Sequence, residues 1–131
     1  MKVLLSIKPI YAKLIFEGTK KFEFRKSIFK NPDITTVVVY ASAPIQRVIG
    51  EFEIDRILID RLEDLWEKTK KYSGIEEDYF YEYFAEKEFG YAIKIKSTKK
   101  YKKSLSLKDD FNLTAPQSFL YLNHYDILEN V

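Results

Sequence analysis

Charged and aromatic residues alternate in the segment GTKKFEFRK, which runs from Gly18 to Lys26. Side chains of a β-strand point alternately to its two faces, so Lys21, Glu23 and Arg25 would share one face and the two phenylalanines between them the other. The phenyl groups suit a hydrophobic core. The charged face suits either a solvated edge strand, where lysine prevents edge-to-edge aggregation, or a binding site.

Each charged group of this segment has chemistry that suits a nucleotide. The guanidinium of Arg25 can bind a phosphate or a carboxylate through two hydrogen bonds, or stack on a base. Glu23 can accept a hydrogen bond from a base amino group, as carboxylates do from cytosine N4, or it can orient Arg25 through an ion pair. Lys20 can contact a phosphate, and it becomes a base or a nucleophile only if burial lowers its pKa.

A second set of carboxylates lies on a later strand. In the pattern RVIGEFEIDRILI, the side chains of Glu51, Glu53 and Asp55 share one strand face with Ile49. If this face and the charged face of the first segment line one cleft, the cleft contains two or three carboxylates with Arg25 and a lysine. A solvated strand face is the alternative for Glu51 and Glu53.

The elements that would position these groups follow from hydrophobic spacing, glycine and proline. Strands are predicted over Val3–Ile7, Phe22–Arg25, Thr35–Tyr40, Arg47–Ile59, Tyr91–Lys96 and Ser118–Leu122. The Thr35–Tyr40 strand reads as central and buried on both faces, and Gly50 indicates a bulge or a close approach to the backbone. Helices are predicted from Pro9 to Gly18, from a capping box at Asp60 to Ser73, and over Glu76–Glu88. Asp109 and Asp110 are placed in a loop.

The order of these elements predicts one α+β domain over residues 1–131. Several short strands with helices inserted between them favour a small, mostly antiparallel β-barrel over a doubly wound sheet. The chain has 46% hydrophobic and 32% charged residues, as is ordinary for a globular domain. A net charge of +2 is mildly basic and does not by itself indicate nucleic acid.

Composition excludes several kinds of site. There is no cysteine, so disulfides, thiol nucleophiles and cysteine metal sites are excluded, and the single histidine, His124, rules out a multi-histidine metal site. No phosphate-loop, dinucleotide, zinc or calcium signature is present, and we expect neither a metal nor a cofactor. Lysines interrupt the apolar N-terminal stretch, so we expect no membrane span and a cytoplasmic protein.

Three further groups are weaker candidates. Lysines interleaved with tyrosine between residues 91 and 103 can follow a nucleic-acid backbone or form a solvated strand and loop. The aromatic stripe at positions 79, 80, 83 and 84 favours a core face over a base-stacking platform. Tyr40, Ser42 and Gln117 would line a cleft if the barrel closes, whereas His124 is expected to be structural or exposed.

Gly18, Lys20, Glu23 and Arg25 together spell G-x-K-x-x-E-x-R. With this motif the chain resembles the ASCH domain family of the PUA-like superfamily, and the resemblance covers essentially the whole chain. The segment SIKP with the following Tyr11-Ala12 is similar to the family's opening, and Tyr40-Ala41-Ser42 to its middle. The segment Ala115–Phe119 is similar to the ending of a branch of small archaeal and bacterial members.

The resemblance implies a PUA-like β-barrel with a cleft beside the motif. It also implies recognition of RNA or a nucleotide as the partner, in RNA metabolism or transcription-linked regulation. The ligand-binding residues it implies are Lys8, Gly18, Lys20, Glu23, Arg25 and Ser42.

Two other functions remain open. Some small ASCH proteins are metal-independent amidohydrolases that act on N4-acylcytidine with a lysine and a threonine of the motif and a later glutamate. Lys20 matches that lysine, but Glu23 stands where the threonine would be, so the catalytic candidates are Lys20, Glu23 and Glu51. A lysine of lowered pKa in an enclosed, nucleoside-sized pocket would favour the hydrolase. An exposed apolar patch that includes the aromatic helix would favour a protein-interaction domain.

Overall fold

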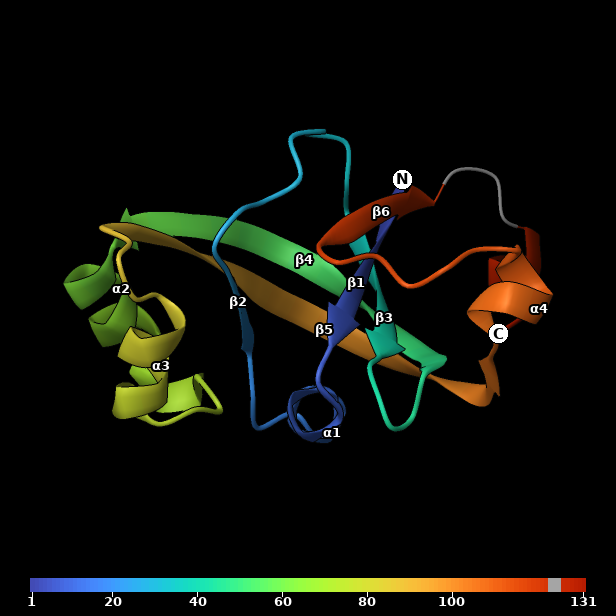
Figure 1. The fold of residues 1–131 in the computed structure, drawn as a ribbon, viewed down its shortest axis with the longest axis horizontal. Helices are drawn as coiled ribbons and strands as arrows, with labels where there is room; N and C mark the ends of the chain where they lie inside the picture. Colours follow the sequence, from blue (N-terminus) through green and yellow to red (C-terminus); the bar gives the residue numbers. More distant parts are fainter. Residues whose placement is uncertain (123–125) are drawn as a thin grey trace.

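A computed structural model describes residues 1–122 and 126–131, so His124 lies outside the described residues. Within these residues, six strands form one mixed sheet in the order β2-β5-β4-β3-β1-β6 (Figure 1). Their bounds are β1 Lys2–Ile7, β2 Phe22–Arg25, β3 Thr36–Ala41, β4 Arg47–Arg61, β5 Phe89–Leu105 and β6 Phe119–Leu122. Neighbouring strands are antiparallel except for the parallel pair β1 and β3. The predicted α+β class is confirmed.

The sheet has two edges, β2 and β6, so the predicted closed barrel is not confirmed. The helices are α1 Pro9–Glu17, α2 Leu62–Thr69, α3 Glu77–Tyr83 and α4 Leu107–Phe111, with short 3-10 helices η1 Lys70–Tyr72 and η2 Asp126–Asn130. Figure 1 shows α2 and α3 at one end of the long β4–β5 ribbon and α4 at the other. None of these helices in the described part of the chain is long and apolar enough to span a membrane.

Local sequence explains the helix and strands that carry the motif. Pro9 occupies the first turn of α1, where its missing N–H is harmless, and Gly18 ends the helix with a φ of 87°. Strand β3 is buried along its whole length between β4 and β1, as its valines predict. A Cβ on Gly50 would lie 2.6 Å from the Phe16 ring, which confirms the expected close approach to the backbone.

In the described part of the chain, the hydrophobic core consists of three clusters. One packs α1 on β1, β3 and the middle of β4, and includes Ile15, Val37 and Phe52. A second covers the opposite face of β1 and β3, where α4 and η2 lie, and includes Leu4 and Tyr101. The third joins β2 and β5 to the helical segment between β4 and β5 through Phe22, Phe24, Leu62, Leu65, Phe80, Phe84 and Ala92. This third cluster fixes α2 and α3 beside the charged motif.

Several predicted boundaries are wrong. Asp60 remains in β4 and pairs with Gly90, so α2 begins after Arg61 without a side-chain cap. Helix α3 is shorter than expected, because it ends at Tyr83 and the chain turns through Glu86 at a φ of 69°. The strand predicted to end at Lys96 is longer, because the basic stretch that follows continues β5 to Leu105.

The predicted loop at Asp109 and Asp110 is helix α4. Its first turn is capped reciprocally: the Ser106 hydroxyl accepts a hydrogen bond from the Asp109 amide, and the Asp110 carboxylate accepts one from the Ser106 amide. These two contacts satisfy backbone groups that a loop would leave to water.

Candidate functional site

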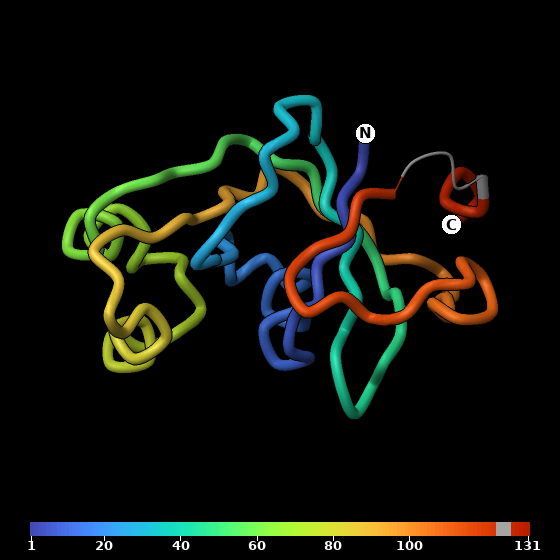
Figure 2. The backbone as a smooth tube through the Cα atoms, turned by 45° about the horizontal axis from the view of Figure 1, so that its top comes forward, coloured from blue at the N-terminus to red at the C-terminus, as the bar shows by residue number. Residues whose placement is uncertain are grey.

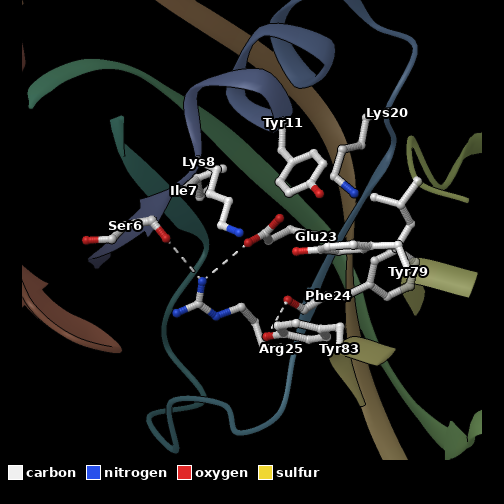
Figure 3. Close-up of a pocket in the computed structure, with 11 residues that line it drawn as sticks. Ser6, Ile7, Lys8, Tyr11, Lys20, Glu23, Phe24, Arg25, Tyr79 and Tyr83 are labelled. Atoms are coloured by element: carbon white, nitrogen blue, oxygen red, sulfur yellow. Dashed lines mark hydrogen bonds and ion pairs between the residues drawn. The ribbon is translucent and has the colours of Figure 1, made fainter. Parts of the chain in front are cut away.

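A pocket with a volume of about 160 Å³ lies beside the motif, between the end of β1, helix α1, strand β2 and helix α3. Figure 3 shows side chains from these separate elements pointing toward one space. The residues that line it are Ser6, Ile7, Lys8, Tyr11, Lys20, Glu23, Phe24, Arg25, Ile75, Tyr79 and Tyr83. Its lining therefore combines cations, one carboxylate and three phenols.

The Lys20 side chain is almost fully enclosed in this pocket, since the residue is 2% exposed. Its Nζ donates a 2.6 Å hydrogen bond to the carbonyl of Ser73. Burial lowers the pKa of Lys20 to about 8, although the nearby Glu23 carboxylate opposes the shift. Lys20 therefore becomes partly neutral at pH values where ordinary lysines are charged.

Glu23 is the buried carboxylate of the pocket, with 7% of the residue exposed. Burial raises its pKa, while the positive charges of Lys20 and Arg25 act in the opposite direction. Its Oε2 accepts a 3.3 Å hydrogen bond from Arg25 Nη1. Among the described residues no donor reaches its Oε1, so one carboxylate oxygen is available to a ligand.

Arg25 is held by protein acceptors on both of its terminal nitrogens. Nη1 donates to the carbonyl of Ser6 at 3.3 Å as well as to Glu23, and Nη2 donates to the carbonyl of Ser118 at 2.8 Å. Figure 2 shows the segment that leads into β6, in orange and red, passing beside β1, in blue. Arg25 thus connects β2 with both of these segments, and the ion-pair alternative for Glu23 and Arg25 is observed.

Three tyrosines form the aromatic part of the lining. The rings of Tyr79 and Tyr83 are nearly parallel, with an interplanar angle of 16° and centroids 6.5 Å apart, and Tyr11 lies 5.8 Å from Tyr79. The Tyr83 hydroxyl donates to the carbonyl of Phe24 at 3.2 Å, which fixes that ring. Burial raises the pKa of Tyr11, and the neighbouring Tyr79 adds to the shift.

Four of the predicted site residues meet in this pocket: Lys8, Lys20, Glu23 and Arg25. Lys8 is exposed, and its Nζ lies 5.9 Å from the centroid of the Tyr79 ring. The other three predicted residues, Gly18, Ser42 and Glu51, do not line it. Gly18 caps α1, and the amide of Ser42 donates to the carbonyl of Ile7.

Glu51 takes part in a different polar cluster. Its carboxylate accepts hydrogen bonds from Lys2 Nζ at 3.1 Å and from the Tyr101 hydroxyl at 2.8 Å. Strand β5 separates β4 from β2 in the sheet, and Glu51 pairs with Lys99, well beyond the part of β5 that pairs with β2. The prediction that the two charged strand faces share one cleft is therefore wrong for Glu51.

Five other lining residues were not predicted from the sequence: Ser6, Tyr11, Ile75, Tyr79 and Tyr83. Only part of the predicted core face on α3 is core: Phe80 and Phe84 are buried in the third cluster, whereas the two tyrosines line the pocket. The type of aromatic residue was the available signal, because a tyrosine hydroxyl favours a position where it can meet water or a polar partner.

The weaker candidates lie elsewhere. Tyr40 is buried in the second cluster and Gln117 is exposed, both outside the pocket lining. In the basic run on β5, Lys94 and Lys96 lie 3.4 Å and 4.0 Å from carboxylates of Asp55 and Glu53. Across residues 1–122 and 126–131, no acidic or histidine side chains gather in a group that could hold a metal ion.

The ASCH domain model matches residues 5–103, a range that contains the motif and all the residues that line the pocket. The chain belongs to the ASCH domain family. Its structure is similar to the crystal structure of ASCH from Zymomonas mobilis, with a TM-score of 0.88 and 25% sequence identity, over 98% of this chain and 92% of that one.

Two curated relatives are also similar in sequence. The ASCH domain-containing ribonuclease of Zymomonas mobilis is 28% identical over 83 residues, which are 63% of this chain and 56% of that protein. The large ribosomal subunit protein uL22 of Ureaplasma parvum serovar 3 is 26% identical over 121 residues, or 92% of this chain. This ASCH chain spans only 39% of the length of that protein.

Proposed function

We propose that this ASCH domain binds RNA by holding one nucleotide in the pocket beside the G-x-K-x-x-E-x-R motif. One relative supports an RNA-related role, since it is named an ASCH domain-containing ribonuclease. The observation that carries the proposal is the lining itself, which places two lysines and a carboxylate among three tyrosine rings. Proteins that bind single-stranded RNA combine positive charge with aromatic surfaces on which bases stack.

The size of the pocket sets the size of the bound group. A volume of about 160 Å³ is well below the roughly 300–1,000 Å³ of sites for drug-sized ligands, so it suits one base or sugar. Tyr79 offers a stacking surface, and the available Oε1 of Glu23 accepts from a base amino group. Lys8, exposed at the rim, contacts the phosphate.

Arg25 supports this arrangement indirectly, by orienting Glu23. Because its guanidinium already donates to two carbonyls and to Glu23, it orients the carboxylate instead of binding a phosphate. The contribution of Arg25 to binding is then indirect and independent of salt, unlike that of Lys8.

A hydrolase that acts on the bound nucleotide is the second candidate, and the burial of Lys20 favours it. With a pKa of about 8, roughly a tenth of the Lys20 side chains are neutral amines at pH 7. A neutral amine beside Glu23 can remove a proton from water that attacks an N4-acyl group, and the N4–acyl bond then breaks with proton transfer to the leaving amine. Glu51, outside the pocket, has no part in this step.

Helix α3 does not provide the exposed apolar patch that would favour a protein-interaction domain. The aromatic stripe of α3 is not an exposed apolar patch, because Phe80 and Phe84 are buried and the two tyrosines line the pocket.

The test is fluorescence anisotropy of labelled single-stranded and hairpin RNAs at two salt concentrations. We expect salt-sensitive binding that Lys8→Ala weakens, while Lys13→Ala, at an exposed lysine of α1 outside the pocket lining, serves as the control. The same samples are assayed for RNA cleavage and for deacylation of N4-acetylcytidine, which separates a binder from a hydrolase. Absence of binding at low salt, or equal effects of the two lysine variants, would contradict the proposal.

A further inference from the structure

The side chain of the motif lysine, Lys20, is hydrogen-bonded to a turn that lies far away in the sequence. Lys20 sits between α1 and β2, whereas Ser73 and Gly74 connect η1 to α3, and Lys20 and Ser73 are 53 residues apart. The Lys20 ammonium donates to the Ser73 carbonyl at 2.6 Å, and the amide of the next residue, Lys21, donates to the Tyr72 carbonyl at 2.8 Å. The Lys20 side chain and the backbone of Lys21 are thus both hydrogen-bonded to the same turn.

Gly74 leaves space for the lysine stem. A Cβ added to Gly74 would lie 2.7 Å from both Cβ and Cγ of Lys20 and 2.8 Å from its Cδ. Carbon atoms cannot approach so closely, so the methylene chain of Lys20 occupies the volume that any side chain at position 74 would need. Because Gly74 has no Cβ, the Lys20 side chain can lie against the turn and reach the Ser73 carbonyl.

The turn itself is tightly held. The Ser73 hydroxyl donates to the Ile75 carbonyl at 2.9 Å and accepts from the Ile75 amide at 3.3 Å. Ser73 is buried, and Ile75 lines the pocket directly. A turn fixed in this way can hold the lysine in one place while keeping its own position in the pocket wall.

We propose that the Ser73–Gly74 turn is the positioning element for Lys20, with Gly74 admitting the lysine stem and the Ser73 carbonyl fixing the terminal nitrogen in the pocket. The inference rests on the proposed function in one respect, that Lys20 faces the bound nucleotide. Ser73 accepts one N–H of the amine. In the neutral form a second N–H and the lone pair remain for a ligand or a water molecule. Figure 3 shows the Lys20 nitrogen on the pocket side, near Tyr11 and Glu23.

A competing explanation for Gly74 is its backbone. Its φ of +69° lies in the left-handed region, where glycine is favoured regardless of its neighbours. Gly18 provides a matched control, because its φ is +87° but a Cβ there would meet nothing within 4 Å. Gly18→Ala and Gly74→Ala therefore introduce similar backbone strain, and only Gly74→Ala displaces Lys20.

The experiment is a lysine titration by NMR on the full chain labelled with ¹³C-lysine, with the Lys20 signal assigned from its loss in Lys20→Met. Glu23 and Tyr11 are the titratable groups facing this amine, and both are present in every variant.

In the wild type we expect Lys20 to titrate near pH 8. In Gly74→Ala the midpoint should rise by at least one pH unit, because the displaced amine gains contact with water, whereas Gly18→Ala should leave it unchanged. An unchanged midpoint in Gly74→Ala, or an equal rise in both variants, overturns the proposal.

A second measurement tests the proposal if Gly74→Ala does not fold. If Gly74→Ala fails to fold because it collides with Lys20, then Gly74→Ala combined with Lys20→Gly, which removes all three colliding atoms, should regain resistance to proteolysis. A double variant as unfolded as Gly74→Ala alone would overturn the proposal, since the glycine would then serve only the backbone. Neither readout uses RNA, so a raised midpoint in a chain that binds no RNA would support the positioning turn and reject the proposed function.

Discussion

The Arg25 guanidinium donates a 2.8 Å hydrogen bond to the carbonyl of Ser118, and this contact links β2, one edge of the sheet, to the segment that enters β6, the other edge. Among the described residues no backbone ladder joins these edges, so a side chain of the motif spans them. The same guanidinium holds Glu23 through an ion pair in which both side chains are largely buried. Arg25 therefore couples the shape of the sheet to the orientation of the pocket carboxylate.

Replacing Arg25 by alanine should destabilise the fold. Two carbonyls and the buried Glu23 would lose their charged donor, and one hydrogen bond to a charged group makes a net contribution of about 1.5–3 kcal/mol to stability. We expect the free energy of unfolding in urea to fall by about 2–4 kcal/mol, with partial recovery in Arg25→Lys. Arg56→Ala, an exposed arginine on β4, is the control and should change stability by less than about 0.5 kcal/mol. Equal stability of Arg25→Ala and wild type would show that water replaces the guanidinium at no cost.

Lys8 should supply the salt dependence of RNA binding. One phosphate contact to single-stranded RNA adds about 0.7 to the slope of log affinity against log salt concentration. We expect Lys8→Ala to reduce the measured slope by that amount. Arg25→Ala should weaken binding without changing the slope, because Arg25 acts through Glu23. A reduced slope in Arg25→Ala would instead place its guanidinium on a phosphate.

Buried Lys20 should make stability depend on alkaline pH. Its pKa of about 8 in the folded chain lies below the ordinary 10.5, so between these values the unfolded chain binds more protons and stability rises with pH. The full increase in the free energy of unfolding is about 3 kcal/mol, and it is absent below pH 8. Because the partly buried Tyr11 and the buried Tyr101 have raised pKa values, they oppose the gain above about pH 10. Urea unfolding of wild type and Lys20→Met between pH 7.5 and 9.5 measures the difference; parallel curves would contradict the lowered pKa.

Much of the motif's setting is predictable from the sequence because it depends on local rules. Pro9 and Gly18 mark the ends of α1, and the alternation of Glu23 and Arg25 with phenylalanines places the charged pair on one strand face. The placement of Glu51 is not local. It depends on which strand lies beside β2, and a sequence pattern gives a strand's two faces without giving its neighbours.

The helical part of the site is equally beyond local reasoning. Tyr79 and Tyr83 reach the pocket because Phe80 and Phe84, on the adjacent face of α3, pack against Phe24 of β2. That packing joins segments more than fifty residues apart. Helical spacing indicates that an apolar face exists, but only tertiary contacts decide where the core ends and the pocket begins.

Exchange of the pocket carboxylate should alter base preference. The available Glu23 oxygen can only accept hydrogen bonds when ionised, which favours the N4 amino group of cytosine over the O4 carbonyl of uracil. Glu23→Gln adds an amide donor, so the preference for oligo(C) over oligo(U) should fall by about 1–3 kcal/mol. Competition binding with the two oligonucleotides measures this change. A preference that stays constant in Glu23→Gln would mean that the carboxylate does not read the base edge.

The stacking role of α3 can be separated from its structural role with two neighbouring tyrosines. Tyr79 lines the pocket, whereas Tyr81, on the same helix, is 38% exposed and lies outside the lining. Alanine substitution of a stacked aromatic residue weakens single-strand binding by about 1–3 kcal/mol per base, so Tyr79→Ala should reduce affinity for single-stranded RNA by roughly that amount. Tyr81→Ala has the same helix propensity cost and should bind as the wild type does. Tyr79→Phe, which keeps the ring and loses the hydroxyl, should retain most of the affinity if stacking dominates. If Tyr79→Phe binds as weakly as Tyr79→Ala, the hydroxyl and its contact with Tyr11 carry the effect, and the bound base does not stack on this ring.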